Sequence, residues 1–135
     1  MSTVIRPEIS EKNDNWIPRH RYYELKHFCM QYNSWKKILN DTDIYPRIIY
    51  SEIKTEYGNP TEKFVIEREC YVRYVGLVDR AANMTDPVLG NYILKGIING
   101  VSYDALKSRL NIPCGKDIYY EMYRRFFAIL DKIRN

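Results

Sequence analysis

Residues 102–125 read SYDALKSRLNIPCGKDIYYEMYRR, and this pattern is typical of a helix-turn-helix. Leu106 and Leu110 lie one helical turn apart, so both are expected to face inward. Asn111 follows where such a turn needs a left-handed residue, a conformation that asparagine tolerates better than most. Ile118 is then placed to pack back against the two leucines. The stretch predicts two helices that cross steeply, with one face of the second helix free for a groove.

Two features of this stretch depart from the usual motif. Lys107 stands where such motifs commonly have a small residue at the close contact between the helices, which leaves the crossing angle open. The segment from Pro113 to Asp117 makes the turn about one residue longer than usual, so the outward-facing positions stay open by one residue. Leucine-rich helical hairpins with purely structural roles share this spacing.

Helical periodicity also covers the N-terminal part of the chain. From Pro18 onward, apolar and aromatic residues recur every three or four positions and predict one long amphipathic helix, through Tyr22, Leu25, Phe28, Cys29, Tyr32, Trp35 and Leu39. Residues 44–50 are the one ambiguous stretch, because they are apolar within a loop-like region. We therefore expect an all-α fold, a helical bundle with a C-terminal helix-turn-helix.

Helix boundaries are marked by local signals. Residues 59–62 (NPTE) and 85–87 (TDP) combine a capping side chain with proline, and they predict two helix starts. Gly100 predicts the end of the second of these helices. Ser102 is placed to cap the helix that follows.

The chain has 135 residues, which is enough for one compact unit and not for two full cores. We expect a flexible N-terminal arm over residues 1–17 and a long helix with an ordered loop over residues 18–60. The helical core with the helix-turn-helix is expected over residues 61–135.

The final helix is expected from about Lys116 to Ile133, with apolar positions at Ile118, Met122, Phe126, Ile129, Leu130 and Ile133. It continues well past the turn, so its second half must pack on the helix near Arg19 or on the same helix of a second copy. Because two-fold operators also favour paired readers, we expect a homodimer.

The bulk composition narrows the class of partner. Lys and Arg number 21 against 17 Asp and Glu, a net charge of +4 that suits a nucleic acid without requiring one. The three cysteines show no CxxC spacing, which favours reduced thiols in an intracellular protein. No apolar run reaches the roughly 20 residues that cross a bilayer, and no secretory signal is recognisable. We expect a cytoplasmic protein with no membrane partner.

Catalytic and metal-binding motifs are not recognisable in the sequence. It contains no phosphate-cradling glycine loop, no HExxH and no nucleophile elbow. His20 and His27 lie seven residues apart, too far for a compact metal pair without further ligands. Cys114 is near a helix start, where a dipole can lower the pKa of a thiol, but no partner histidine is evident. We expect a non-enzymatic protein with no metal and no cofactor.

A family resemblance also favours a non-enzymatic, DNA-binding protein. Residues 91–103 (NYILKGIINGVSY), with Leu106, Leu110 and the basic, aromatic helix after Lys116, resemble the ArpU and RinA type of phage and prophage late transcription regulators. The carboxy-terminal unit of that family is similar to the promoter-reading helix-turn-helix of sigma factors. The resemblance implies sequence-specific binding to double-stranded phage promoter DNA in a bacterial host cell, with host RNA polymerase as a second candidate partner.

A second likeness involves residues 19–29 (RHRYYELKHFC) and residues 112–117 (IPCGKD). Both segments resemble uncharacterised proteins that are carried by prophages of Gram-positive bacteria. This likeness is closer in its residues but carries little information about activity.

In a DNA-reading interpretation, side chains early in the second motif helix meet base edges, which makes candidates of Lys116, Asp117, Tyr119 and Tyr120. Phosphate contacts are expected from Arg124 and Arg125, and further backbone contacts from Tyr103 and Lys107. The same cations can be simple solvated charges, and Asp117 can serve only to complement the helix dipole. At least one of the tyrosines of this helix must lie in the core or at an interface.

The alternative interpretation is a phage-encoded protein-interaction module that inhibits a host defence or polymerase component and keeps the helical hairpin as a scaffold. A DNA reader is expected to show its cations, Lys107, Lys116, Arg124 and Arg125, on one connected face. An interaction module is expected to expose aromatic side chains there.

Overall fold

The computed structural model describes residues 15–40 and 60–134, and within these ranges the chain forms helices and no strand. The helices are α1 (Arg19–Met30), α2 (Tyr32–Asn40), α4 (Pro60–Thr85), α5 (Leu89–Asn99), α6 (Tyr103–Leu110) and α7 (Lys116–Arg134). The predicted all-α helical bundle is confirmed. Searched over the same residues, none of the helices is long and apolar enough to span a membrane.

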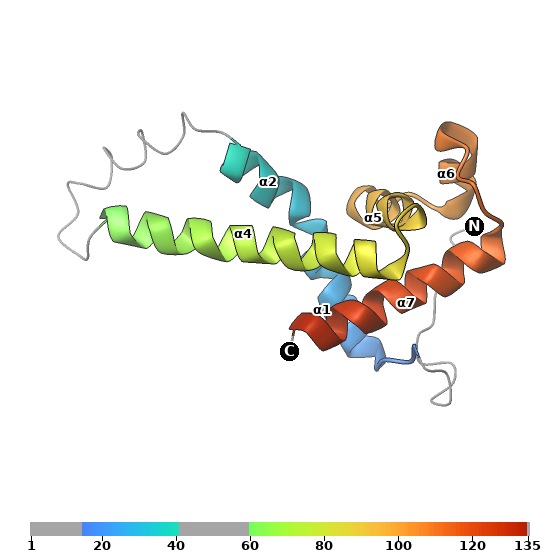
Figure 1. Ribbon diagram of the computed structural model, residues 1–135, viewed down its shortest axis with the longest axis horizontal. Helices are drawn as coiled ribbons and strands as arrows, with labels where there is room; N and C mark the ends of the chain where they lie inside the picture. Colours follow the sequence, from blue (N-terminus) through green and yellow to red (C-terminus); the bar gives the residue numbers. More distant parts are fainter. Residues whose placement is uncertain (1–14, 41–59, 135) are drawn as a thin grey trace.

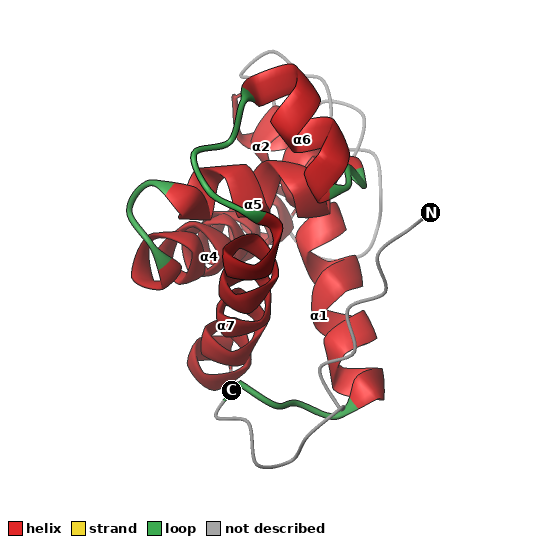
Figure 2. Ribbon diagram, turned by 90° about the vertical axis from the view of Figure 1, so that its right-hand side faces the viewer, coloured by secondary structure: helices red, strands yellow, loops and turns green. Residues whose placement is uncertain are grey.

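The helices are arranged around the pair formed by α4 and α7 (Figure 1). α5 packs against both of them, and α1 packs against α5 and α7. α2 lies along α4, beside the part of α4 that extends away from α7 (Figure 1). α6 packs on α5 and stands at one end of the molecule, next to the start of α7 (Figures 1 and 2).

Several predicted boundaries are confirmed, and one is wrong. α4 begins at Pro60 and α5 ends at Asn99, after which Gly100 adopts a left-handed conformation with φ 64°. Of the expected N-terminal arm only residues 15–17 are described, and Ile17 belongs to the core, so the arm cannot extend to residue 17. The ambiguous residues 44–50 lie outside the described residues.

The long first helix that the periodicity predicts is divided in two at Gln31. The backbone of Gln31 has ψ −5°, well away from the α-helical value of about −42°. This break directs the rings of Phe28 in α1 and Trp35 in α2 to the same tyrosine, Tyr74 of α4, with centroid distances of 5.4 and 5.2 Å. Six of the seven predicted inward residues are buried as expected, and Leu39 is half-buried.

The inward face of α7 differs from the prediction. Ile118 is 50% exposed and Leu110 is 43% exposed, so the expected packing of Ile118 on the two leucines is wrong. The residues buried instead are Tyr119, Tyr123, Phe126, Phe127, Ala128 and Leu130. The long turn before α7 delivers Tyr119 to the core in the place expected for Ile118. Met122, Ile129 and Ile133 are half-buried at the edge of this face.

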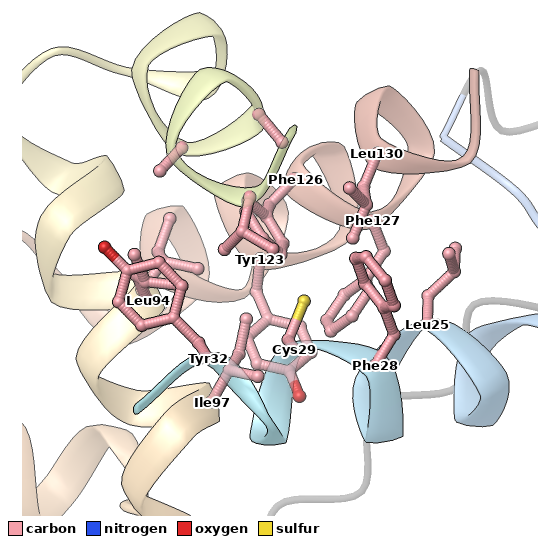
Figure 3. Packing of buried hydrophobic residues seen from close by; sticks show 14 of the residues in the cluster. Leu25, Phe28, Cys29, Tyr32, Leu94, Ile97, Tyr123, Phe126, Phe127 and Leu130 are labelled. Carbon is pink, nitrogen blue, oxygen red and sulfur yellow. The ribbon is translucent and has the colours of Figure 1, made fainter. Parts of the chain in front are cut away.

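The space around α7 is filled by helices of the same chain. Figure 3 shows Leu25 and Phe28 of α1 and Phe127 and Leu130 of α7 in one buried cluster. α4 and α5 cover other parts of α7. A second copy is therefore not needed to bury the second half of α7, which removes the packing argument for the expected homodimer.

The backbones of α4 and α5 approach each other closely at Gly90 of α5. A Cβ atom added to Gly90 would lie 2.1 Å from the carbonyl oxygen of Ala82 in α4. Only glycine lets the two backbones come this close. Gly76 offers a matched comparison, because it lies inside α4 and a Cβ atom there meets nothing within 4 Å.

We expect opposite effects of alanine at these two glycines. Gly90→Ala forces the two backbones apart and should lower the free energy of unfolding by about 3 kcal/mol or more. Gly76→Ala removes the entropic disadvantage of glycine in a helix and should raise it by about 0.5–1 kcal/mol. Urea unfolding followed by circular dichroism measures both changes. Equal effects of the two substitutions would contradict the close approach at Gly90.

Candidate nucleic-acid interface

α6 is bounded by the residues that the sequence marks as its ends. The Ser102 hydroxyl accepts a hydrogen bond from the backbone N–H of Ala105 at 3.3 Å, as predicted for an N-cap. At the other end Asn111 has φ 50° and ψ 52°, and its N–H bonds to the carbonyl of Lys107. The predicted left-handed residue is confirmed, and it reverses the chain direction after α6.

Two side chains of α6 hold the turn that leads into α7. The Tyr103 hydroxyl donates to the Cys114 carbonyl at 2.6 Å, and the Lys107 ammonium donates to the Ile112 carbonyl at 3.2 Å. Lys107 is exposed and does not enter the contact between helices. Its departure from the usual motif therefore has a local explanation, because the lysine binds a carbonyl of the lengthened turn.

A small residue, Gly96 of α5, lies where α5 closely contacts α6 and α7. A Cβ atom on Gly96 would lie 2.6 Å from the Tyr119 hydroxyl and 3.2 Å from a methyl carbon of Leu106. The absence of a side chain at Gly96 thus makes room for the ring of Tyr119. This contact fixes the start of α7 against α5.

The predicted site residues divide by exposure. Tyr119 and Tyr103 are only 1% and 8% exposed, so both are core residues in this structure and not surface contacts. Their rings lie 5.5 Å apart, centroid to centroid. Lys107, Lys116, Asp117 and Arg125 are exposed, whereas Tyr120 and Arg124 are half-buried.

The cations do not form one connected face. Residues four apart place Lys116, Tyr120 and Arg124 along one flank of α7. Arg125 is rotated by about 100° from Arg124 and lies toward the turn between α4 and α5. There the carboxylate of Asp86 accepts hydrogen bonds from the backbone N–H groups of Leu89 and Val88, which lower its pKa, and the charge of Arg125 lowers that pKa further.

The flank that carries Arg124 faces the side of α1. Asp131 lies seven residues after Arg124, close to the same face of α7. Its carboxylate accepts a hydrogen bond from the Arg21 guanidinium of α1 at 2.5 Å. Lys107 of α6 lies beside the turn before α7, where its ammonium group donates to the Ile112 carbonyl.

Cys114 is a half-buried free thiol in the turn before α7. Burial raises its pKa, and the charge of Lys107 only partly opposes this effect. His20 and His27 are both exposed on α1, and among the described residues no group of acidic, histidine or cysteine side chains could hold a metal ion. One exposed cation that the sequence analysis did not select is Arg109, in the last turn of α6.

No protein-family model, no curated protein and no solved structure matches the chain.

The two buried tyrosines give a test of how α6 and α7 are joined. Tyr103→Phe removes the hydrogen bond to the Cys114 carbonyl and should lower the free energy of unfolding by about 1 kcal/mol. The Tyr119 hydroxyl has no hydrogen-bond partner among the described residues, so Tyr119→Phe should leave stability unchanged or raise it. Thermal unfolding of both variants measures the difference. A larger loss in Tyr119→Phe than in Tyr103→Phe would rule out this arrangement.

Proposed function

We propose that this protein is a double-stranded DNA-binding transcription regulator of phage or prophage origin, and that it contacts DNA through α6 and the first turns of α7. The observation that supports this proposal best is the distribution of cations on both flanks of α7. Lys116 and Arg124 lie on one flank, Arg125 lies toward the other, and Lys107 lies beside the turn before α7.

Cations on two flanks suit a helix in the major groove. The groove is about 12 Å wide, and a helix with its side chains is about 10–12 Å across, so a phosphate backbone runs along each side of the helix. Arg124 would then bind phosphates of one strand, and Arg125 those of the other. A single connected basic face, which the sequence analysis expected, is not required by this geometry.

Base recognition is assigned to the exposed start of α7. Lys116 can bind guanine, and Asp117 can accept a hydrogen bond from cytosine. Both side chains are exposed in the first turn of the helix. Tyr120 remains a candidate contact, whereas Tyr103 and Tyr119 act by shaping the turn and the core. Arg109 adds a further phosphate contact from the end of α6.

The wider biological role is part of the same proposal. The protein would act on phage promoter DNA in the cytoplasm of a bacterial host, with host RNA polymerase as a second partner. If two copies bind a two-fold operator as a homodimer, they would pair through a surface other than the buried face of α7.

A second candidate function is supported by α4. On its surface Val65, Ile66 and Val72 are each about 50% exposed. Apolar residues in such a position are typical of a protein-interaction surface. A module that binds a host defence or polymerase component would use this part of the chain, and would keep α6 and α7 as scaffold.

DNA binding is tested with fluorescent duplexes from the flanking phage genome over a salt series. We expect sequence-dependent binding that weakens steeply with salt, because several phosphates are neutralised. The triple variant Lys116→Ala, Arg124→Ala and Arg125→Ala should bind at least about tenfold more weakly, with the logarithmic salt slope reduced by about 2 for its two phosphate contacts.

The control removes the same number of charges elsewhere. Lys36 and Lys37 of α2 and Lys132 in the last turn of α7 are exposed and distant from the start of α7. Their triple alanine variant should bind DNA nearly as well as the wild type. Absence of wild-type binding at low salt would move the assignment to the interaction module, and equal losses in both variants would remove the interface from α7.

A further inference from the structure

α4 has an outer face that stays exposed along the helix, and its first half extends beyond α7 (Figure 1). At about 100° per residue, the side chains of this face fall within about one third of the helix circumference. They are Ile66, Glu69, Val72, Gly76, Arg80 and Met84, and all except the glycine are exposed. The buried residues Val78 and Ala82 lie on the other side of the helix. The outer face is therefore the part of α4 that the rest of the described chain leaves uncovered.

Gly76 is the residue of the outer face that contacts within the chain do not explain. Glycine inside a helix is destabilising relative to alanine. At Gly90 and Gly96 a close contact accounts for the glycine, because an added Cβ atom would lie 2.1 Å from the Ala82 carbonyl oxygen and 2.6 Å from the Tyr119 hydroxyl. A Cβ atom at Gly76 meets nothing within 4 Å. By analogy with Gly90, this glycine suits the close approach of a helix from outside the chain.

The apolar residues of the outer face are placed symmetrically about this glycine. Ile66 and Met84 lie 18 residues apart, about five full turns, so both lie on the same line along the helix. Ile66 is 53% exposed and Met84 is 51% exposed. The midpoint between them is residue 75, next to Gly76. If a second copy of α4 lies antiparallel on this face, with a two-fold axis near residue 75, Ile66 of each copy meets Met84 of the other.

The charged residues of the outer face follow the same symmetry with opposite signs. Glu69 and Arg80 lie 11 residues apart, about three turns, and their midpoint falls between residues 74 and 75. The same two-fold axis therefore places Glu69 of each copy opposite Arg80 of the other, to within about one residue. A parallel pair would place Glu69 beside Glu69. Both side chains are exposed, and neither forms an ion pair or a hydrogen bond with another residue in the described part of the chain.

We propose that the outer face of α4 pairs with the same face of a second copy of this chain, with the two helices antiparallel about a two-fold axis near Gly76. Ile66 meets Met84 and Glu69 meets Arg80 across this axis, and the two backbones approach closely at Gly76. The proposal goes beyond the proposed function, since it rests on α4 alone and is measured without DNA. Its failure would leave the proposed DNA interface of α6 and α7 unaffected.

The first measurement is sedimentation equilibrium of the full chain without DNA, from about 1 to about 500 µM. We expect a reversible equilibrium between one and two copies, with a dissociation constant on the order of 10 µM, because the contact is only one helix wide. A chain that remains a single copy at every concentration would overturn the proposal. The outer face would then be left to a host protein, as in the second candidate function.

Charge reversal tests the antiparallel arrangement. Glu69→Arg places two arginines together across the axis, and Arg80→Glu places two glutamates together, so each variant alone should associate at least about tenfold more weakly. A one-to-one mixture of the two variants should restore pairing as a heterodimer, because each contact across the axis then joins opposite charges.

Glu67→Arg is the matched control for Glu69→Arg. Glu67 is exposed on the opposite side of the same helix, and its reversal changes the net charge equally. This control should associate like the wild type. Equal weakening by Glu67→Arg and Glu69→Arg, or a mixture that does not pair, would overturn the proposed arrangement.

Gly76→Leu tests the close approach at the axis. The new side chain meets open space within a single copy, so thermal unfolding at about 1 µM should be unchanged or shifted upward. Association should nevertheless weaken by at least about tenfold, because the leucine holds the two backbones apart. Association at wild-type strength would contradict the proposed axis. The wild-type dilution series decides whether two copies pair even if a variant folds poorly.

Discussion

Burial of the aromatic face of α7 is the constraint on which the other helices depend. Each ring that leaves water contributes about 3 kcal/mol, but each tyrosine also brings a hydroxyl whose burial without a partner costs about 1–3 kcal/mol. At Tyr123 the hydroxyl is satisfied by a hydrogen bond shared with Tyr22 of α1. At Tyr119 the absence of a side chain on Gly96 of α5 leaves room for the hydroxyl. α1 and α5 are therefore positioned by the requirements of tyrosines on α7, and α6 and its turn follow from the position of α5.

Local features of the fold could be predicted from the sequence, whereas the choice of buried face could not. Ser102 begins α6, and Asn111 and Gly100 end α6 and α5, through contacts with residues a few positions away, so the neighbouring sequence is sufficient to predict them. The inward face of α7 depends on how many residues the preceding turn contains and on Tyr22, which is separated from Tyr123 by 101 positions. Tyrosine fits both an inward and an outward face of a helix, so helical periodicity alone predicted that the isoleucines of α7 face inward. The break at Gln31 carries no glycine or proline signal, and it reflects packing on α4.

In the candidate interface, too, some features could be predicted from the neighbouring sequence and others depend on the folded structure. Exposure of Lys116 and Asp117 follows from their place in the first turn of α7, where the helix has just left the core. Lys107 departs from the usual motif in the sequence. The structure supplies the reason, because its ammonium group binds the Ile112 carbonyl. Two of the three tyrosines predicted to contact DNA, Tyr103 and Tyr119, lie in the core. A hydroxyl that suits a surface also suits a buried hydrogen bond, as at Tyr103. In the candidate interface, the geometry of the turn before α7 determines which side chains are exposed more strongly than residue type does.

The aromatic core and the candidate interface are joined through α7. Tyr120 stands between Lys116 and Arg124 on one flank of the helix. Its ring contacts those of Tyr119 and Tyr123, at centroid distances of 5.0 and 6.1 Å. The rings of Tyr119 and Tyr123 are buried, so their positions in the core constrain the ring of Tyr120. The direction in which the flank with Lys116 and Arg124 faces therefore depends on the packing of the core as well as on the helix itself.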